Sequence, residues 1–158
     1  MTHKQTRKQL KTLYLIEQFK RSHRVEEVDP GAAAQWAYEN GLWKLLPIDP
    51  VRVLRREMTQ ALRGEYHEDP QSREVRKNHP VYDRATGKVI WVDIRKAKPE
   101  QMRISFQGHR NRILSECKQL SFDYDSYNEN NLFGETLPPI EFDFTADIEE
   151  SKQPLQYT

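Results

Sequence analysis

Residues 49–76, DPVRVLRREMTQALRGEYHEDPQSREVR, begin with a predicted helix whose two faces differ in chemistry. Asp49 followed by Pro50 is typical of a helix start, because aspartate caps free N–H groups and proline suits the first helical position. At about 100° per residue, one arc is apolar and carries Val51, Leu54, Met58, Ala61 and Leu62. The opposite arc, here called the outer arc, carries Arg52, Arg55, Arg56, Thr59, Gln60 and Arg63. The pattern predicts an amphipathic helix over 51–63, ended by Gly64, with its apolar arc against a core.

Two more helices are predicted before this stretch. In the first, apolar residues recur at helical spacing: Leu10, Leu13, Tyr14, Ile16 and Phe19. The second starts with Asp29 as its cap and closes at Gly41. Trp36 and Ala37 are expected to face inward in this short, alanine-rich helix.

The chain after the amphipathic helix is polar and then predicts a β-hairpin. The polar residues 67–78 carry three basic side chains, Arg73, Arg76 and Lys77. In HPVYDRATGKVIWVDI, residues 79–94, a five-residue turn ends at Gly87, where positive φ is needed, between two arms of apolar residues. In the second arm one face holds Ile90, Val92 and Ile94, and the other holds Val89, Trp91 and Asp93. One of these faces should meet the core, and Arg84 and Lys88 flank the turn.

A fourth helix is predicted to start after Lys98 and to continue to about Asp123, since Pro99 and Glu100 suit a first turn. Its apolar row follows helical spacing through Met102, Phe106, His109, Ile113, Cys117 and Leu120. A lone histidine in such a row is typical of a boundary or hydrogen-bonded core residue. The only cysteine, Cys117, has no partner for a disulfide and is expected to be a small buried side chain in a reducing compartment.

The charges of the chain are strongly divided along its length. Residues 1–118 hold 24 Lys and Arg against 15 Asp and Glu, whereas residues 119–158 hold one lysine against nine acids. The body therefore carries a surplus of +9 and the tail a surplus of −8. Such asymmetry favours contact of the basic part with nucleic acid or a membrane surface.

The acidic tail also contains a pattern of period two. Ile140, Phe142 and Phe144 alternate with Glu141, Asp143 and Thr145, as in a strand that adds to a sheet edge or docks onto a partner. The last eight residues have no periodicity and are expected to be disordered.

Several classes of protein are disfavoured by what the sequence lacks. It has no glycine-rich phosphate loop, nucleophile elbow or paired metal-binding histidines. The carboxylate pairs Asp123/Asp125 and Glu141/Asp143 lie in the acidic segment, where a solvated tail explains them better than a metal site. No apolar run is long enough to span a bilayer, and no secretory signal pattern is present. We therefore expect a cytoplasmic protein that is not an enzyme and uses no cofactor or metal.

The order of these parts resembles the winged helix-turn-helix fold, in which the third helix enters the major groove and the hairpin, or wing, touches the flanking backbone. The resemblance covers residues 8–94, with a third helix at 51–63 and a wing at about 75–94. The connection from Gly41 to Asp49 is longer than the tight turn of a simple helix-turn-helix and contains Trp43, Leu45 and Leu46. The segments DPQSREVRKNH and WVDI are also similar to parts of small uncharacterised bacterial proteins, which implies no activity.

The predicted fold is mainly α with a small β-hairpin (α+β). Residues 1–98 form the winged-helix-like body. Residues 99–125 form a long helix that packs on the body or pairs with a second copy, and residues 126–158 form an acidic, partly disordered tail.

The resemblance and the charges together predict binding of nucleic acid, with duplex DNA as the expected form. Arginine and glutamine read base edges, and threonine and arginine also bind phosphate, so the outer arc is the expected reading surface. The expected phosphate contacts are Arg73, Arg76, Lys77, Arg84 and Lys88. A regulator or accessory factor fits this prediction better than an enzyme.

Three other interpretations stay open at this point. The outer arc is an ordinary solvated face, although it opposes four arginines to one acid, Glu57. In a second interpretation the body is a protein-interaction module and the tail, through Ile140, Phe142 and Phe144, recruits a partner. In a third, the acidic tail covers the basic body and inhibits its binding. A homodimer through the fourth helix also stays open.

Overall fold

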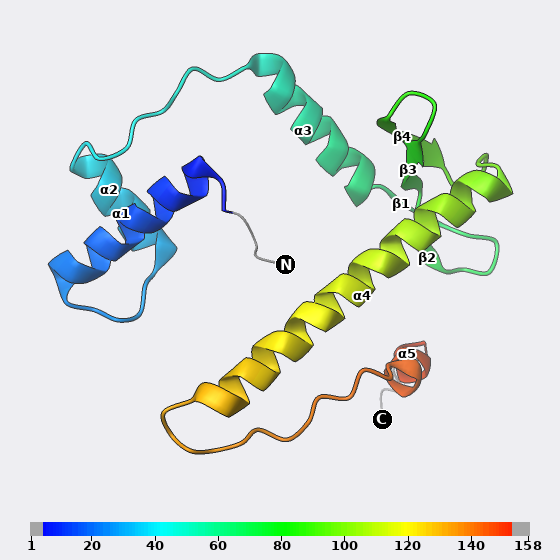
Figure 1. The fold of residues 1–158 in the computed structure, drawn as a ribbon. Coiled ribbons are helices and arrows are strands. Elements are labelled where there is room, and N and C mark those ends of the chain that lie inside the picture. The colour runs from blue at the N-terminus through cyan, green and yellow to red at the C-terminus, as the bar shows by residue number, and fades with distance from the viewer. Residues whose placement is uncertain (1–4, 153–158) are drawn as a thin grey trace, which may run out of the picture. The chain divides into compact units, whose positions relative to one another are not determined.

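A computed structural model describes residues 5–152 of the chain. The helices are α1 (Arg7–His23), α2 (Pro30–Glu39), α3 (Pro50–Gly64), α4 (Pro99–Asn130) and α5 (Thr145–Ser151) (Figure 1). The strands are β1 (Tyr66–Glu68), β2 (Glu74–Arg76), β3 (Asn78–Asp83) and β4 (Lys88–Asp93), paired as two antiparallel hairpins. This mixture confirms the α+β class. The chain divides into two compact units, Met1–Arg55 and Arg56–Thr158, with the boundary inside α3.

The first unit is built on the packing of α1 against α2. Phe19, Ala33 and Ala37 are buried, and the Phe19 ring meets the edge of Trp36 at 5.8 Å between centroids. The inward orientation of Ala37 is confirmed, and Trp36 is half-buried. Gly41, at φ +67°, closes α2 as predicted, because its N–H and that of the next residue bond back to carbonyls of the last turn.

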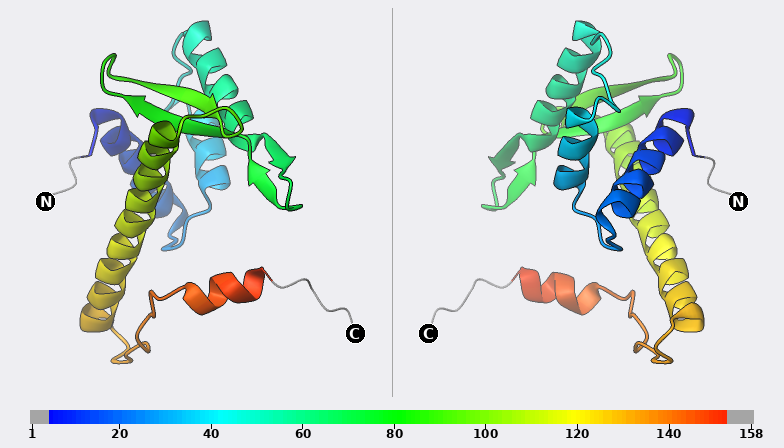
Figure 2. Two further views of the ribbon diagram at one scale, coloured as in Figure 1. Left: turned by 90° about the vertical axis from the view of Figure 1, so that its right-hand side faces the viewer. Right: turned by 90° about the vertical axis from the view of Figure 1, so that its left-hand side faces the viewer.

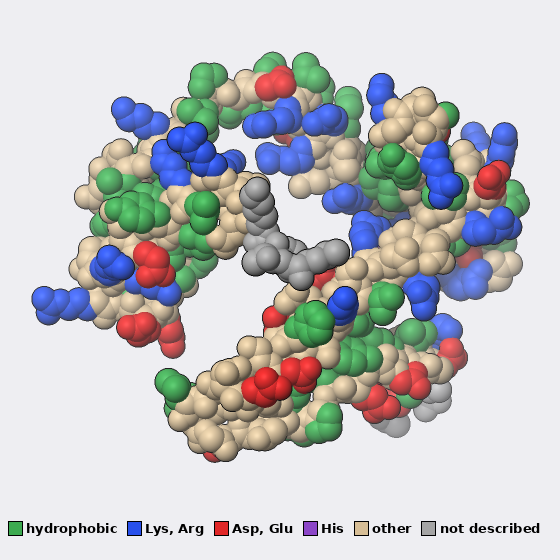
Figure 3. Space-filling model, viewed as in Figure 1, with side chains coloured by type: hydrophobic (Ala, Val, Ile, Leu, Met, Phe, Trp, Pro, Cys, Tyr) green, Lys and Arg blue, Asp and Glu red, His purple; other side chains and the backbone are tan. Residues whose placement is uncertain are grey.

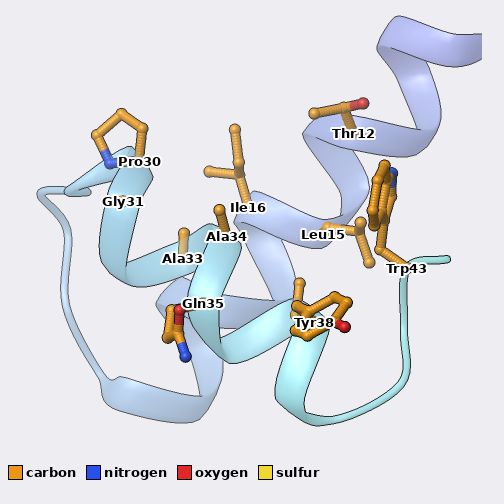
Figure 4. Close-up of a pocket in the computed structure, with 11 residues that line it drawn as sticks. Thr12, Leu15, Ile16, Pro30, Gly31, Ala33, Ala34, Gln35, Tyr38 and Trp43 are labelled. Atoms are coloured by element: carbon orange, nitrogen blue, oxygen red, sulfur yellow. The ribbon is translucent and has the colours of Figure 1, made fainter. Parts of the chain in front are cut away.

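The apolar face predicted for the first helix is only partly correct. Leu10, Leu13 and Tyr14 are exposed, while Leu15 and Ile16 line a groove of about 490 Å³ with residues of α2 (Figure 4). The reason is length: α2 has 10 residues and α1 has 17, so α2 covers only part of α1.

Helix α3 begins and ends where the sequence predicts. The Asp49 carboxylate accepts from the Val51 N–H at 3.0 Å and caps the helix. The prediction that its apolar arc faces a core is wrong for four of the five residues. Val51, Leu54 and Met58 are 73%, 51% and 57% exposed, and Ala61 is exposed as well, whereas Leu62 is half-buried. The buried side chains belong instead to α1, α2, β3 and α4.

The predicted hairpin is confirmed as β3 and β4, with Val81 opposite Ile90 and Gly87 at φ +67° in the turn. The Asp83 carboxylate holds the turn by accepting from the Ala85 N–H at 2.9 Å and the Thr86 hydroxyl at 2.8 Å. Residues 67–78 are predicted only as a polar connection. The structure shows that most of this stretch belongs to a second, shorter hairpin, formed by β1 and β2. Strands of only three residues give too little alternation to be recognised.

The second unit is organised by β3, which packs on the N-terminal half of α4 (Figure 2). Val81 of β3 and Ser105 of α4 are buried there, and the His79 and Phe106 rings meet edge to face at 5.5 Å. This contact fixes the hairpin on the long helix.

Helix α4 is longer than predicted and runs to Asn130 rather than Asp123. The change to acidic composition at Ser121 alters the charge of the helix without ending it. Asn131 ends it, because its side-chain amide donates to the carbonyls of Tyr127 at 3.1 Å and Glu135 at 2.7 Å.

The predicted edge strand at Ile140, Phe142 and Phe144 is absent from the part of the chain that the structure describes. The segment is irregular and leads into α5, where the Asp143 carboxylate accepts from the Thr145 N–H at 3.1 Å. Upstream, Asn128 and Leu137 exchange two hydrogen bonds that return the tail along the end of α4. The expectation of disorder in the last eight residues concerns positions 151–158, of which only 151 and 152 are described.

Acid should weaken the second unit by protonating carboxylates whose pKa the fold lowers. Arg95 donates to Asp93 from Nε at 3.0 Å and from Nη2 at 2.6 Å, which holds the pKa of Asp93 well below its ordinary 3.8. The hydrogen bond from Thr86 likewise lowers the pKa of Asp83. These groups stabilise the fold above pH 3.8, and the contribution is lost as the pH falls through their lower folded-state pKa.

The variant Asp93→Asn should therefore be less stable than the wild type near neutral pH and should lose less stability on acidification. Thermal unfolding followed by circular dichroism from about pH 7 to pH 2 measures both effects. Asp147→Asn on α5 is the matched control, since this exposed carboxylate has no ion pair within residues 5–152. Equal pH dependence in the wild type and Asp93→Asn would contradict the assignment.

Candidate functional site

A small basic pocket forms where α3, the two hairpins and α4 meet within the second unit. Its volume is about 50 Å³, and its lining residues are Arg63, Arg76, Asn78, His79, Pro80, Trp91, Ser105, His109 and Arg112. A water molecule occupies roughly 30 Å³ in the liquid, so the pocket accepts a group of only a few heavy atoms. We call it the basic pocket.

The end of α3 is tied to the hairpin by a buried amide. The Asn78 side chain, at the start of β3, donates to the Leu62 carbonyl at 3.3 Å and to Glu65 Oε2 at 2.8 Å. Lys77 forms an ion pair with the same carboxylate, and these two partners lower the pKa of Glu65. The last turn of α3 is therefore fixed beside β3, and this places Arg63 over the Trp91 ring with 6.0 Å between guanidinium and centroid.

The hairpin residues of the pocket are also held in place. Arg76 Nε donates to the Tyr66 hydroxyl at 3.3 Å across β1 and β2. A ring nitrogen of His79 lies 3.0 Å from the Arg76 carbonyl oxygen. Pro80 lies opposite Trp91 in the β3–β4 register.

Helix α4 contributes pocket residues that the sequence pattern does not assign to a site. In the sequence His109 is a lone histidine in an apolar row, and Arg112 carries no distinguishing signal. Ser105, His109 and Arg112 follow each other by four and three residues and so share one helix face. That spacing is the available signal, but only the position of β3 shows that this face meets Arg63 and Arg76.

The electrostatics of the pocket are unbalanced. Three arginines line it, and none of its described lining residues carries a carboxylate. The nearby acids are already engaged, Glu65 with Lys77 and Asp93 with Arg95. Three like charges at the rim of so small a pocket repel one another unless an anion lies between them.

The other predicted site residues divide into two groups. Arg73 forms an ion pair with Asp69 at 2.7 Å, and Lys77 pairs with Glu65, so both hold loops together within the second unit. Arg84 and Lys88 are exposed at the tip of the β3–β4 hairpin and form no ion pair with any described residue.

On α3, five members of the outer arc, Arg52, Arg55, Arg56, Gln60 and Arg63, are exposed, and Thr59 is half-buried. Of the predicted residues, the pocket brings together only Arg63 and Arg76.

The charge division of the sequence is visible on the surface of the second unit. Lys and Arg side chains gather around the hairpins and the N-terminal half of α4, and Asp and Glu side chains gather on its C-terminal half and the tail (Figure 3). The residues of the tail that are predicted to bind a partner, Ile140, Phe142 and Phe144, are all partly exposed. The rings of Phe142 and Phe144 meet edge to face, with 6.4 Å between their centroids.

Two other kinds of site are absent from the described residues. Between residues 5 and 152, no group of three or more His, Cys, Asp or Glu is placed to hold a metal ion. No helix in that same range combines the length and apolar character needed to cross a membrane. Comparison of the chain with protein families, curated proteins and solved structures finds no match.

A divalent oxyanion should stabilise the protein through the basic pocket. Sulfate is expected to raise the free energy of unfolding by about 1 kcal/mol over chloride of equal ionic strength, as a ligand of the folded state does at several times its Kd. Arg112→Gln should remove most of this difference and should be at least as stable as the wild type in chloride, because it relieves repulsion. Thermal unfolding in the two salts is the measurement.

The control for that experiment is Arg84→Gln, which removes the same charge at the hairpin tip. It should keep the full response to sulfate. A response that Arg112→Gln retains unchanged would rule out the pocket as the anion site.

Proposed function

We propose that this protein binds nucleic acid, with duplex DNA as the favoured form, and that the basic pocket receives a backbone phosphate. The observation that carries the proposal is the convergence of Arg63, Arg76 and Arg112 on one small pocket with no carboxylate among its lining residues. Arginine forms paired hydrogen bonds to phosphate oxygens, and a phosphate fits a site that accepts few heavy atoms.

A polymer explains the surroundings of the pocket better than a small free anion does. Arg84 and Lys88 lie exposed at the tip of the same hairpin, and Arg56, Gln60 and Arg63 lie exposed along α3. Phosphates repeat along a nucleic acid strand, so several basic groups spread over one surface bind it together.

The winged-helix resemblance is the reason to favour a duplex. In that arrangement the outer arc of α3 reads base edges and the β3–β4 hairpin contacts the flanking backbone. Contact of the hairpin with the backbone is supported by Arg84 and Lys88 at its tip, which form no ion pair with any described acid. We infer a regulator or accessory factor rather than an enzyme.

The test is a titration of duplex DNA, single strands and RNA at two or more salt concentrations. Affinity for the duplex should fall with salt, with a slope of log K against log salt near −0.9 for each phosphate bound. Arg63→Ala with Arg112→Ala should weaken binding and make the slope shallower by about 0.9 for each phosphate that the variant no longer neutralises. Arg52→Ala with Arg56→Ala should also weaken duplex binding.

Arg103→Ala is the matched control for Arg112→Ala. It removes the same charge from α4, but Arg103 is exposed and does not line the pocket. If the control lowers affinity as much as Arg112→Ala, diffuse charge rather than the pocket explains the binding. Absence of binding at low salt would reject the proposed function.

A second candidate is a protein-interaction module that uses the tail. It is favoured by the exposed apolar residues Phe142, Phe144 and Ile148 among five acids of residues 141–150. An apolar row with flanking acids suits a partner with a basic, apolar groove. The same acids would compete with phosphates if they reached the basic surface.

Neutralising the tail separates these possibilities. In a variant with Glu141, Asp143, Asp147, Glu149 and Glu150 changed to their amides, autoinhibition predicts tighter DNA binding, most clearly at low salt, where charges are least screened. The titration described above measures the change. DNA affinity equal to that of the wild type at low salt would exclude autoinhibition.

A further inference from the structure

One face of α4 lies open between the two places where its own unit packs on it. The residues of this face fall within an arc of about 80° at helical spacing. We call it the α4 seam: Ile113, Cys117, Leu120 and Tyr127. Phe106 and His109 before it contact the hairpin, and Tyr124 borders the tail. Ile113 and Leu120 of the seam are 52% and 46% exposed. Apolar side chains in a row at this spacing are typical of a helix that packs on another helix.

The charges of α4 run against the preference of an isolated helix. Residues 99–118 contain four basic and two acidic side chains, and residues 119–130 contain three acidic and no basic ones. Acids near a helix C-terminus are unfavourable because the last carbonyls already carry negative partial charge. Asp123, Asp125 and Glu129 form no ion pair with residues 5–152. Cations from outside the helix would offset this arrangement.

We propose that α4 pairs with α4 of a second copy of the chain, antiparallel, about a two-fold axis near Cys117. This orientation sets the basic half of each helix against the acidic half of the other, whereas a parallel pair would set like charges together. Arg110 stands seven residues before Cys117 and Tyr124 seven after it. Arg110 therefore comes level with Tyr124 of the second copy, next to Asp125, which lies on the same flank of α4 as Arg110.

Those charges cannot meet within one chain. Fifteen residues separate Arg110 from Asp125, and at 1.5 Å per residue they lie about 22 Å apart along α4. A second copy supplies both the missing cations and an apolar surface of the same length.

The existing packing leaves room for this partner. The hairpin lies on the flank of α4 that carries Ser105, His109 and Arg112, and the tail lies on the opposite flank, at Ser121, Tyr124, Asp125 and Asn128. Ile113, Cys117 and Leu120 line neither of these pockets. In an antiparallel pair each flank faces the same flank of the other copy. The hairpin of one copy thus comes opposite the bare end of the other helix, and the seams meet without displacing hairpin or tail.

Sedimentation equilibrium of the full chain without nucleic acid tests the proposal independently of the proposed function. The wild type should form a dimer that weakens as salt rises, and Ile113→Asp should be monomeric over the same concentrations. Ser115→Asp is the control, because it adds the same charge on the opposite face of α4. A wild type that stays monomeric, or a control that dissociates as readily as Ile113→Asp, would overturn the proposal. Circular dichroism verifies that both variants keep their helices.

The only cysteine reports the orientation. Cys117 lies near the proposed axis, so mild oxidation of the wild type should give a disulfide-linked dimer. In Ile113→Cys with Cys117→Ser the two cysteines would be about 12 Å apart along the helices, too far for a disulfide, and cross-linking should disappear. Equal cross-linking of this variant would indicate a parallel pair and contradict the proposal.

Discussion

The packing of β3 on the N-terminal half of α4 is the contact on which the rest of the second unit depends. It buries Val81 and Ser105 and sets the His79 ring against Phe106. The Asn78 amide then ties the end of α3 to the same strand. Through these few contacts three arginines from three elements reach one pocket, although 49 positions separate Arg63 from Arg112 in the sequence.

The charged residues of this unit have distinct tasks that composition alone does not separate. Arg73, Lys77 and Arg95 each bind a carboxylate in a loop or at the end of a helix or strand, and they stabilise local structure. Arg63, Arg76 and Arg112 instead line one small pocket that has no carboxylate among its lining residues. In the proposed function this pocket receives a backbone phosphate, and the exposed cations of the hairpin tip bind neighbouring phosphates of the same polymer.

Local chemistry made much of the fold predictable. Asp49 and Pro50 start α3, Gly41 closes α2, and Asp83 with Gly87 forms the hairpin turn, each through interactions between near neighbours in sequence. The predictions that are wrong or absent concern features that depend on packing between residues far apart in the sequence, or on patterns too weak to recognise. Val51, Leu54 and Met58 have the spacing of a core face and yet lie exposed. The two strands within residues 66–76 have only three residues each, too few to show alternation. Only Arg63 and Arg76 of the predicted site residues line the pocket, because its other half comes from α4.

Binding of a backbone phosphate by the three pocket arginines is tested most directly by NMR. Isotopically labelled protein is titrated with a short DNA duplex and observed through the arginine Nε–Hε resonances. The resonances of Arg63, Arg76 and Arg112 should shift together at low salt and return as salt is added. Those of Arg73 and Arg95, whose guanidinium groups already bind carboxylates, should move little. If the duplex binds while the resonances of all three pocket arginines stay unchanged, the basic pocket is not the phosphate site.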